Sequence, residues 1–363
     1  MSFPSNRRRL LLTAWSAALA APLRAQSGGS RADPIAPPDA PPVRDTFFGV
    51  TVEDPYRHLE AVDDPAVAAW MRAQAERTRR TLDAIGPRAE WVRFFHRIDA
   101  ATPARVASVV RGANDRWFYL KRAVGANQFA LTWRDGLDGA EHRLVDPDAL
   151  GGPGQAPLAI NWFSPSPSGR LVAYGLSRGG SEDAVLHLID TRTGRAVGRP
   201  IDRTPFAGVS WDGDGTLYFN RLRALPRGAP ATEKYLRSAV VRLNVGQPEP
   251  HPVPVLDEAR AGVSLLPAET PYVSITHDGR WALGWLIHGV QRELRLLVAP
   301  AASVRSGRPA WRPLLDRADA VTHADYHDDT LYLLSLRGAP RSLLPRVAFE
   351  GEVPQLVSAT RER

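Results

Sequence analysis

The chain has 363 residues, 44% hydrophobic and 23% charged, proportions typical of a soluble globular protein with one large domain or two to three ordinary ones. Its 29 glycines and 32 prolines indicate many turns rather than long helices. Although the net charge is +7, the basic residues form no stripe that could follow a phosphate backbone, so we expect no nucleic-acid binding. The absence of cysteine excludes disulfides, thiolate catalysis and cysteine-bound zinc.

The N-terminus has the pattern of a secretory signal peptide. Three arginines precede an apolar run that is too short to span a bilayer comfortably. Small residues follow, with possible cleavage after Ala20 or after Ala25. Arg7-Arg8 resembles a twin-arginine signal. We therefore expect residues 1–25 to be removed and the protein to be periplasmic or secreted, without membrane association after cleavage; an uncleaved membrane anchor is the alternative.

A linker and a helical extension are predicted next. Residues 26–44 are rich in Pro, Ala and Ser, lack periodicity and are predicted to be disordered. Asp63-Asp64-Pro65 offers an acidic N-cap and a Pro at the first helical position, and the helical periodicity that follows ends at Gly86-Pro87. A shorter helix is predicted to follow, with one apolar face formed by Trp91, Phe94, Phe95 and Ile98. The helical extension is placed at residues 45–102.

From residue 103, a turn followed by alternating apolar and aromatic residues occurs five times. The turns are Asn114-Asp115, Ser168-Gly169, Asp214-Gly215, Asp278-Gly279 and Asp328-Asp329. The steps between them are 53, 46, 64 and 50 residues, which is the period of a β-propeller blade. We therefore predict an all-β fold in which residues 103–363 form an incomplete propeller of about five blades.

Residues 175–179 fit the G-x-S-x-G pattern of a nucleophile elbow, with Ser177 as the candidate nucleophile. Such an elbow lies between a buried strand and a helix. Here the following residues, 184–190, are rich in apolar and β-branched types and predict a second strand. A hairpin offers no helix N-terminus to support an oxyanion, so we predict that Ser177 is a hairpin residue.

The other polar clusters do not predict a site. His323 and His327, with Asp325, Asp328 and Asp329, could suggest a metal site on a helix. The surrounding sequence instead predicts a turn and therefore exposed loop residues. The glycines of residues 151–154 lack the Lys and Ser/Thr of a phosphate-binding loop. We predict no catalytic, cofactor-binding or metal-binding residue in this chain.

Several stretches match the phrases of one protein family in order. Asp54 to Glu60 reads DPYRHLE, and residues 162–194 contain SPSPSGR, AYGLSRGGSE and DTRTG. Shorter matches lie between residues 117 and 219 and at Gly338-Ala339-Pro340. Together, over about residues 45–350, these resemble the prolyl oligopeptidase family of serine peptidases.

The resemblance implies a peptidase that cleaves after proline. In this family a seven-bladed propeller caps an α/β-hydrolase domain and admits only short peptides to it. The hydrolase domain follows the propeller and carries a Ser-Asp-His triad, in which the Ser lies in a GGSNGG-like elbow. No such elbow occurs here. We therefore expect the chain to be the gating portion, inactive alone, with proline-containing peptides as ligands and a hydrolase domain as the missing partner.

Two alternative functions would place the chain in other classes of protein. The first is a stand-alone, non-catalytic periplasmic propeller that binds a peptide or protein partner. The second, a carbohydrate-active propeller enzyme, requires paired carboxylates at the blade starts, and the sequence places no such pair.

Overall fold

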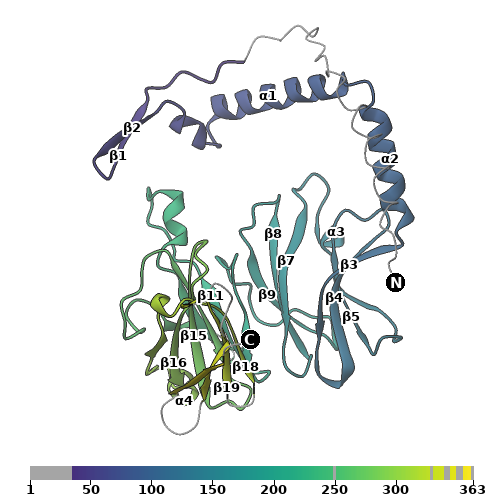
Figure 1. Cartoon of the computed structure of the whole chain (residues 1–363). Coiled ribbons are helices and arrows are strands. Elements are labelled where there is room, and N and C mark those ends of the chain that lie inside the picture. Colours follow the sequence, from purple (N-terminus) through teal and green to yellow (C-terminus); the bar gives the residue numbers. More distant parts are fainter. Residues whose placement is uncertain (1–34, 248–250, 328–329, 339–343, 349–354, 361–363) are drawn as a thin grey trace, which may run out of the picture. The chain divides into compact units, whose positions relative to one another are not determined.

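A computed structural model describes residues 35–247, 251–327, 330–338, 344–348 and 355–360. The predicted signal peptide and the start of the predicted linker lie outside the described residues. The chain divides into two compact units, one ending at Arg97 and the other beginning at Ile98 (Figure 1). In the described part of the chain, no helix combines the length and apolar character needed to cross a membrane.

The N-terminal unit contains a hairpin and helices. Strands β1 (Val43–Phe47) and β2 (Val50–Asp54) pair antiparallel, and a 3-10 turn at Arg57–Glu60 follows. From the sequence, only helices were expected in this unit. The hairpin was missed because its turn places Phe48 and Gly49 at φ of 50° and 81°, and Phe is an unusual residue in the left-handed region.

The two predicted helices are present. Helix α1 (Pro65–Asp83) begins at the predicted cap, where the Asp64 carboxylate accepts hydrogen bonds from two backbone N–H groups, of Ala66 at 2.8 Å and Val67 at 3.2 Å. Helix α2 (Arg88–Ala101) follows Gly86-Pro87.

The described end of the predicted linker contacts α1. The Trp70 Nε1 and Gln74 Nε2 groups donate to the carbonyl of Ile35, at 3.1 and 2.9 Å. The linker residues from 35 to 42 nevertheless form no helix or strand.

The second unit contains five antiparallel sheets in its described residues, and their strands follow one another in chain order. Sheet 1 consists of β3 (Ala104–Arg111), β4 (Arg116–Ala123), β5 (Ala130–Asp135) and β6 (His142–Val145). Sheet 2 consists of β7 (Leu158–Pro165), β8 (Leu171–Arg178) and β9 (Val185–Asp190). Sheet 3 consists of β10 (Ser210–Asp212), β11 (Thr216–Arg221), β12 (Ala239–Asn244) and β13 (Val253–Leu256).

Sheets 4 and 5 repeat this layout. Sheet 4 consists of β14 (Glu269–Ile275), β15 (Trp281–His288), β16 (Arg295–Pro300) and β17 (Arg312–Leu315). Sheet 5 consists of β18 (Val321–His327), β19 (Thr330–Ser335), β20 (Leu344–Ala348) and β21 (Gln355–Thr360). The connections contain short helical turns, which are η2 (Ala113–Asp115), α3 (Pro147–Leu150), η3 (Ala231–Tyr235), α4 (Ala301–Arg305) and η4 (Arg317–Asp319).

The repeated phrase of the sequence forms the same part of every sheet. Each apolar run lies in the second strand, in β4, β8, β11, β15 and β19. In sheets 2 and 4 the glycine of the preceding turn has a positive φ, 71° at Gly169 and 69° at Gly279, which glycine adopts without steric cost. The predicted Asp328-Asp329 turn lies outside the described residues.

Neighbouring sheets share buried apolar clusters. Phe118 of sheet 1 packs in one cluster with Val172 of sheet 2, and Leu186 of sheet 2 packs in the next with Phe219 of sheet 3. Sheets 3 and 4 share a third cluster, and sheets 4 and 5 a fourth. Face-to-face packing of successive antiparallel sheets is the arrangement of propeller blades, so the predicted all-β propeller is confirmed.

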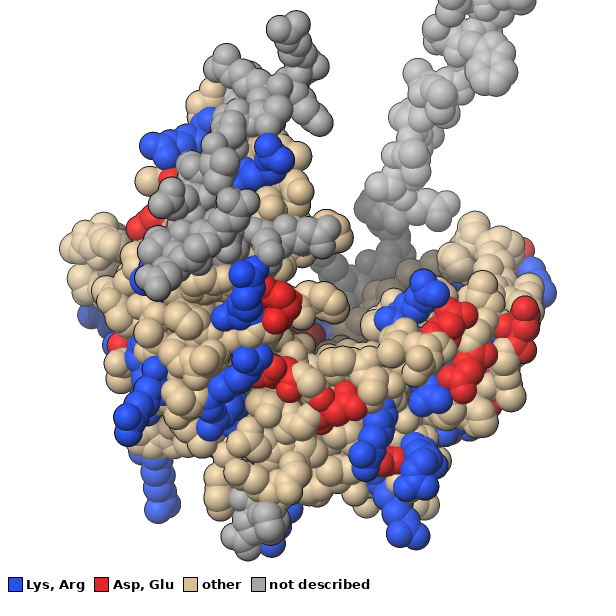
Figure 2. Space-filling view, turned by 90° about the horizontal axis from the view of Figure 1, so that it is seen from below, with Lys and Arg blue, Asp and Glu red and all other residues tan. Residues whose placement is uncertain are grey.

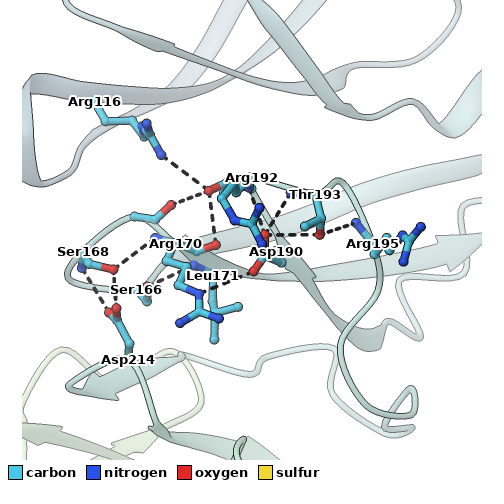
Figure 3. Close-up of polar contacts among 12 residues, drawn as sticks. Arg116, Ser166, Ser168, Arg170, Leu171, Asp190, Arg192, Thr193, Arg195 and Asp214 are labelled. Atoms are coloured by element: carbon cyan, nitrogen blue, oxygen red, sulfur yellow. Dashed lines mark hydrogen bonds and ion pairs between the residues drawn. The ribbon is translucent and has the colours of Figure 1, made fainter.

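Polar contacts between turns also join neighbouring sheets (Figure 3). The backbone N–H of Ser168 donates to the Asp214 carboxylate at 3.0 Å, and its hydroxyl donates to the same carboxylate. The Arg116 guanidinium donates to the Thr191 hydroxyl at 3.4 Å. On the face shown in Figure 2, acidic and basic side chains are interspersed.

Candidate functional site

Ser177 lies inside strand β8, opposite Ala159 of β7, and is only 3% exposed. Gly179 and Gly180 follow with φ of 63° and 73°, and the predicted second strand, β9, comes next. The sequence G-x-S-x-G is therefore not followed by a helix here. Ser177 therefore belongs to the hairpin that β8 and β9 form, within its first strand.

The histidine pair lies in a strand, and the predicted turn at this position was wrong. His323, Asp325 and His327 alternate along β18 and are exposed on one face. The error arose because a run with exposed polar residues at every second position lacks the apolar density of the repeated strands. Within the described part of the chain, no group of three or more His, Asp or Glu side chains is arranged to hold a metal ion.

Two exposed aromatic rings in the loops of sheets 2 and 3 form a better candidate. Phe206 and Tyr235 are 48% and 44% exposed, and their ring centroids lie 6.3 Å apart. Phe206 precedes β10, whereas Tyr235 ends η3. An exposed aromatic pair of this kind offers flat apolar faces to a ligand.

The backbone on both sides of Phe206 is fixed to the neighbouring strands. Buried Thr204 donates to the Ala184 carbonyl through its backbone N–H at 3.1 Å and its hydroxyl at 2.9 Å. On the other side of the ring, the Asn220 N–H donates to the Ala207 carbonyl at 2.7 Å. Phe206 therefore projects from a short segment that is anchored at both ends.

An ion pair joins the loop that carries Tyr235 to the β8–β9 loop. The Lys234 ammonium lies 2.8 and 3.1 Å from the two carboxylate oxygens of Asp183, and 5.0 Å from the centroid of the Tyr235 ring. The hydrogen bond to Asp183 raises the pKa of Lys234, so the ammonium remains charged. The site can bind an apolar ring beside a polar rim, but its residues include no nucleophile paired with a base.

A buried ionic cluster organises sheet 4 and the turn before sheet 5. The fully buried Glu269 carboxylate accepts from Arg295 at 2.8 and 2.9 Å and from Arg317 at 2.5 Å. The Leu266 N–H donates to it at 2.8 Å. This cluster could not be predicted from the sequence, because Arg295 and Arg317 lie 26 and 48 residues from Glu269.

The five sheets define a propeller, and its loops carry the exposed Phe206–Tyr235 pair. The family model described as "Prolyl oligopeptidase, N-terminal beta-propeller domain" matches residues 37–357. The chain therefore belongs to the prolyl oligopeptidase family, through its N-terminal propeller domain.

Curated relatives agree with this assignment. A prolyl endopeptidase of Elizabethkingia meningoseptica is 24% identical over 319 residues, covering 84% of this chain and 41% of the relative. A prolyl endopeptidase of Elizabethkingia miricola is 23% identical over 324 residues, covering 86% of this chain and 42% of the relative. The chain thus spans less than half the length of these relatives.

Solved structures show the same fold. A chain from a structural study of two prolyl endopeptidases is 25% identical, with a TM-score of 0.72, and the match covers 87% of this chain and 44% of that one. Prolyl oligopeptidase B from Galerina marginata, bound to a 35mer substrate, is 16% identical with a TM-score of 0.69, over 89% of this chain and 47% of that one.

Proposed function

We propose that the chain is the substrate-gating portion of a prolyl oligopeptidase-type serine peptidase and acts together with an α/β-hydrolase domain. The observation that carries the proposal is the family match over residues 37–357, together with coverage of only 41% of the first prolyl endopeptidase relative. In this role the propeller selects short proline-containing peptides, and the hydrolase domain supplies the nucleophile, base and oxyanion donors.

The apolar surface of the N-terminal unit supports a domain partner. On α2, Trp91 and Phe95 are 57% and 61% exposed, and Phe94 contacts both rings at centroid distances of 5.8 and 5.7 Å. Clustered exposed aromatics of this kind mark interaction surfaces. We assign the hydrolase domain as the partner that covers them.

The Phe206–Tyr235 pair is the proposed peptide contact. Proline rings are apolar and rigid, and recognition of proline-rich segments commonly uses grooves lined by aromatic side chains. Lys234 and Asp183, which are paired at 2.8 Å, border the two rings and offer polar contacts to the peptide backbone.

A chimera tests the gating role. Residues 37–357 of this chain would replace the matching portion of the Elizabethkingia meningoseptica prolyl endopeptidase, and turnover of a short chromogenic Gly-Pro peptide would be compared with that of an unfolded protein. We expect cleavage of the short peptide and exclusion of the protein. Equal cleavage of both substrates by a folded chimera would contradict gating.

The peptide contact is tested in the same chimera. Phe206→Ala and Tyr235→Ala should raise KM several-fold with little change in kcat, because they remove binding contacts away from the reacting bond. Leu137→Ala is the matched control, since Leu137 is 60% exposed in a turn of sheet 1. A KM shift in the control equal to that of Phe206→Ala would refute the assignment.

Residues 37–357 tested alone should not turn over the Gly-Pro peptide, and Ser177→Ala should leave the measured turnover unchanged. Turnover by the wild-type chain that Ser177→Ala abolishes would show that Ser177 is the nucleophile and would overturn the proposal.

A periplasmic or secreted location is also part of the proposal. It rests on the signal-like pattern of residues 1–25. Replacing Arg7 and Arg8 by Lys should block export of the full chain if the signal is of the twin-arginine type. If the unchanged chain reached neither the periplasm nor the medium, the proposed location would be contradicted.

A further inference from the structure

We propose that a cavity at the outer side of sheets 2 and 3, here named the rim cavity, binds an aliphatic carboxylate. The rim cavity has a volume of about 440 Å³, within the size range of small-molecule sites. Its apolar wall is formed by Leu188, Val197, Ile201, Leu243 and Val245. The proposal concerns a site separate from the Phe206–Tyr235 pair and does not depend on the peptidase assignment.

The rim cavity forms where sheet 2 lacks a regular fourth strand. Ile201 exchanges two backbone hydrogen bonds with Leu186, at 2.8 and 2.9 Å, and the Val197 N–H donates to the Leu188 carbonyl at 2.9 Å. Between these two anchor points, Gly198 takes a φ of 70°, and Pro200 has no N–H to donate. Residues 198–200 therefore leave the strand path and re-aim Arg199, as a β-bulge does.

Positive charge at the rim cavity is not balanced by its lining. Arg199 and Arg221 both line it, and no Asp or Glu does. Arg221 is paired with Asp202, which also pairs with Arg203 at 3.2 Å. Arg199 is exposed and forms no ion pair or hydrogen bond with any residue that the structure describes. One guanidinium is thus available to an anion beside an aliphatic wall.

The remaining chemistry of the lining favours an aliphatic chain over a peptide. Apart from the two arginines, the described lining has one polar side chain, the imidazole of His251, and no hydroxyl, amide or carboxylate side chain. A peptide would bring amide groups that need hydrogen-bond partners, and leaving them unpaired on burial costs free energy. An aliphatic chain requires no such partner, and a terminal carboxylate matches the planar guanidinium of Arg199.

Octanoate is the probe, titrated by calorimetry into the full chain, with octan-1-ol as the uncharged counterpart. We expect saturable octanoate binding at one site and weaker octanol binding. Arg199→Gln should weaken octanoate binding about tenfold through loss of the charged hydrogen bond, while octanol binding stays unchanged. Arg195→Gln, an exposed arginine of the same segment outside the lining, is the matched control and should have no effect.

A second variant tests the apolar wall. Val197→Phe should fill the rim cavity and weaken both probes, and an unchanged melting temperature would show that the fold is retained. The absence of saturable octanoate binding would overturn the proposal, as would equal affinities of the Arg199→Gln and Arg195→Gln variants. Displacement of octanoate from this site by a proline-containing peptide would overturn the choice of ligand.

Discussion

The two units of the chain differ in how far they bury their aromatic side chains. In the sheet unit, Phe118 and Phe219 are at most 1% exposed, because each lies between two sheets. In the N-terminal unit, Trp91 and Phe95 are 57% and 61% exposed, although they recur on one helical face as a core-forming pattern would. Apolar periodicity thus predicts which face of an element needs a partner, but it does not say whether the partner is in the same chain.

The difference follows from how each fold buries surface. A blade needs only the next blade, which follows it within about 50 residues, so its core forms from chain that is near in sequence. A helix pair needs a facing surface from another element. In the N-terminal unit, Val67 is the buried residue of α1, and α2 has none.

The largest expected effect is on the sheet unit. Phe219→Ala removes a ring from the cluster between sheets 2 and 3 and should lower the free energy of unfolding by about 3–5 kcal/mol. Urea denaturation followed by tryptophan fluorescence measures it. A loss below about 1 kcal/mol would mean that this interface is not close-packed. The contrast between buried aromatics in the sheets and exposed aromatics in the helices would then not hold.

The second-largest loss of unfolding free energy is expected at the buried carboxylate of Glu269. Glu269→Gln leaves Arg295 and Arg317 without their shared counter-charge and should cost about 3 kcal/mol in the same assay. Glu258→Gln is the control, because its pair with Arg237 is half exposed, and such pairs contribute about 1 kcal/mol or less. Equal losses in the two variants would show that burial of Glu269 has no energetic consequence.

The Asp278 carboxylate should make a smaller contribution to stability, which is lost in acid. Burial opposes ionisation of Asp278, but hydrogen bonds from Thr276 and Arg280 outweigh it and lower its pKa from 3.8 to about 2. Since the folded-state pKa is depressed, the stabilisation is complete above pH 3.8 and is lost as pH falls through about 2.

Asp278→Asn should therefore be less stable than the wild type by roughly 1–2 kcal/mol at neutral pH. The gap should narrow between pH 4 and pH 2, which urea titrations across this range would show. A gap that stays constant down to pH 2 would indicate that the carboxylate charge does not contribute.

The smallest effect is expected in the N-terminal unit. Phe95→Ala should change the free energy of unfolding by less than about 0.5 kcal/mol, as surface substitutions usually do. It is the matched partner of Phe219→Ala, since both remove one phenyl ring. A loss as large as that of Phe219→Ala would mean that the exposed face of α2 is covered in the isolated chain, and the comparison would fail.

Features encoded by neighbouring residues could be predicted from the sequence. The cap at Asp64 and the turn at Gly169 depend on backbone preferences within a few residues, and both are present as predicted. The propeller followed from repetition of such local phrases.

Features made by distant or atypical residues could not be predicted in this way. The Glu269 cluster joins residues from three separate segments. The rim cavity depends on where the bulge at residues 198–200 meets sheet 3. The turn at Phe48 and strand β18 use residues that are unusual for those conformations.

Hydrogen exchange on the isolated chain tests the central claim most directly. The account predicts that amides of the central strands β8 and β15 exchange only through global unfolding, whereas amides of α1 and α2 exchange earlier through local opening, since most of their large apolar side chains are exposed. Equal protection of the helices and these strands would contradict it, because the N-terminal unit would then be as self-sufficient as the sheets.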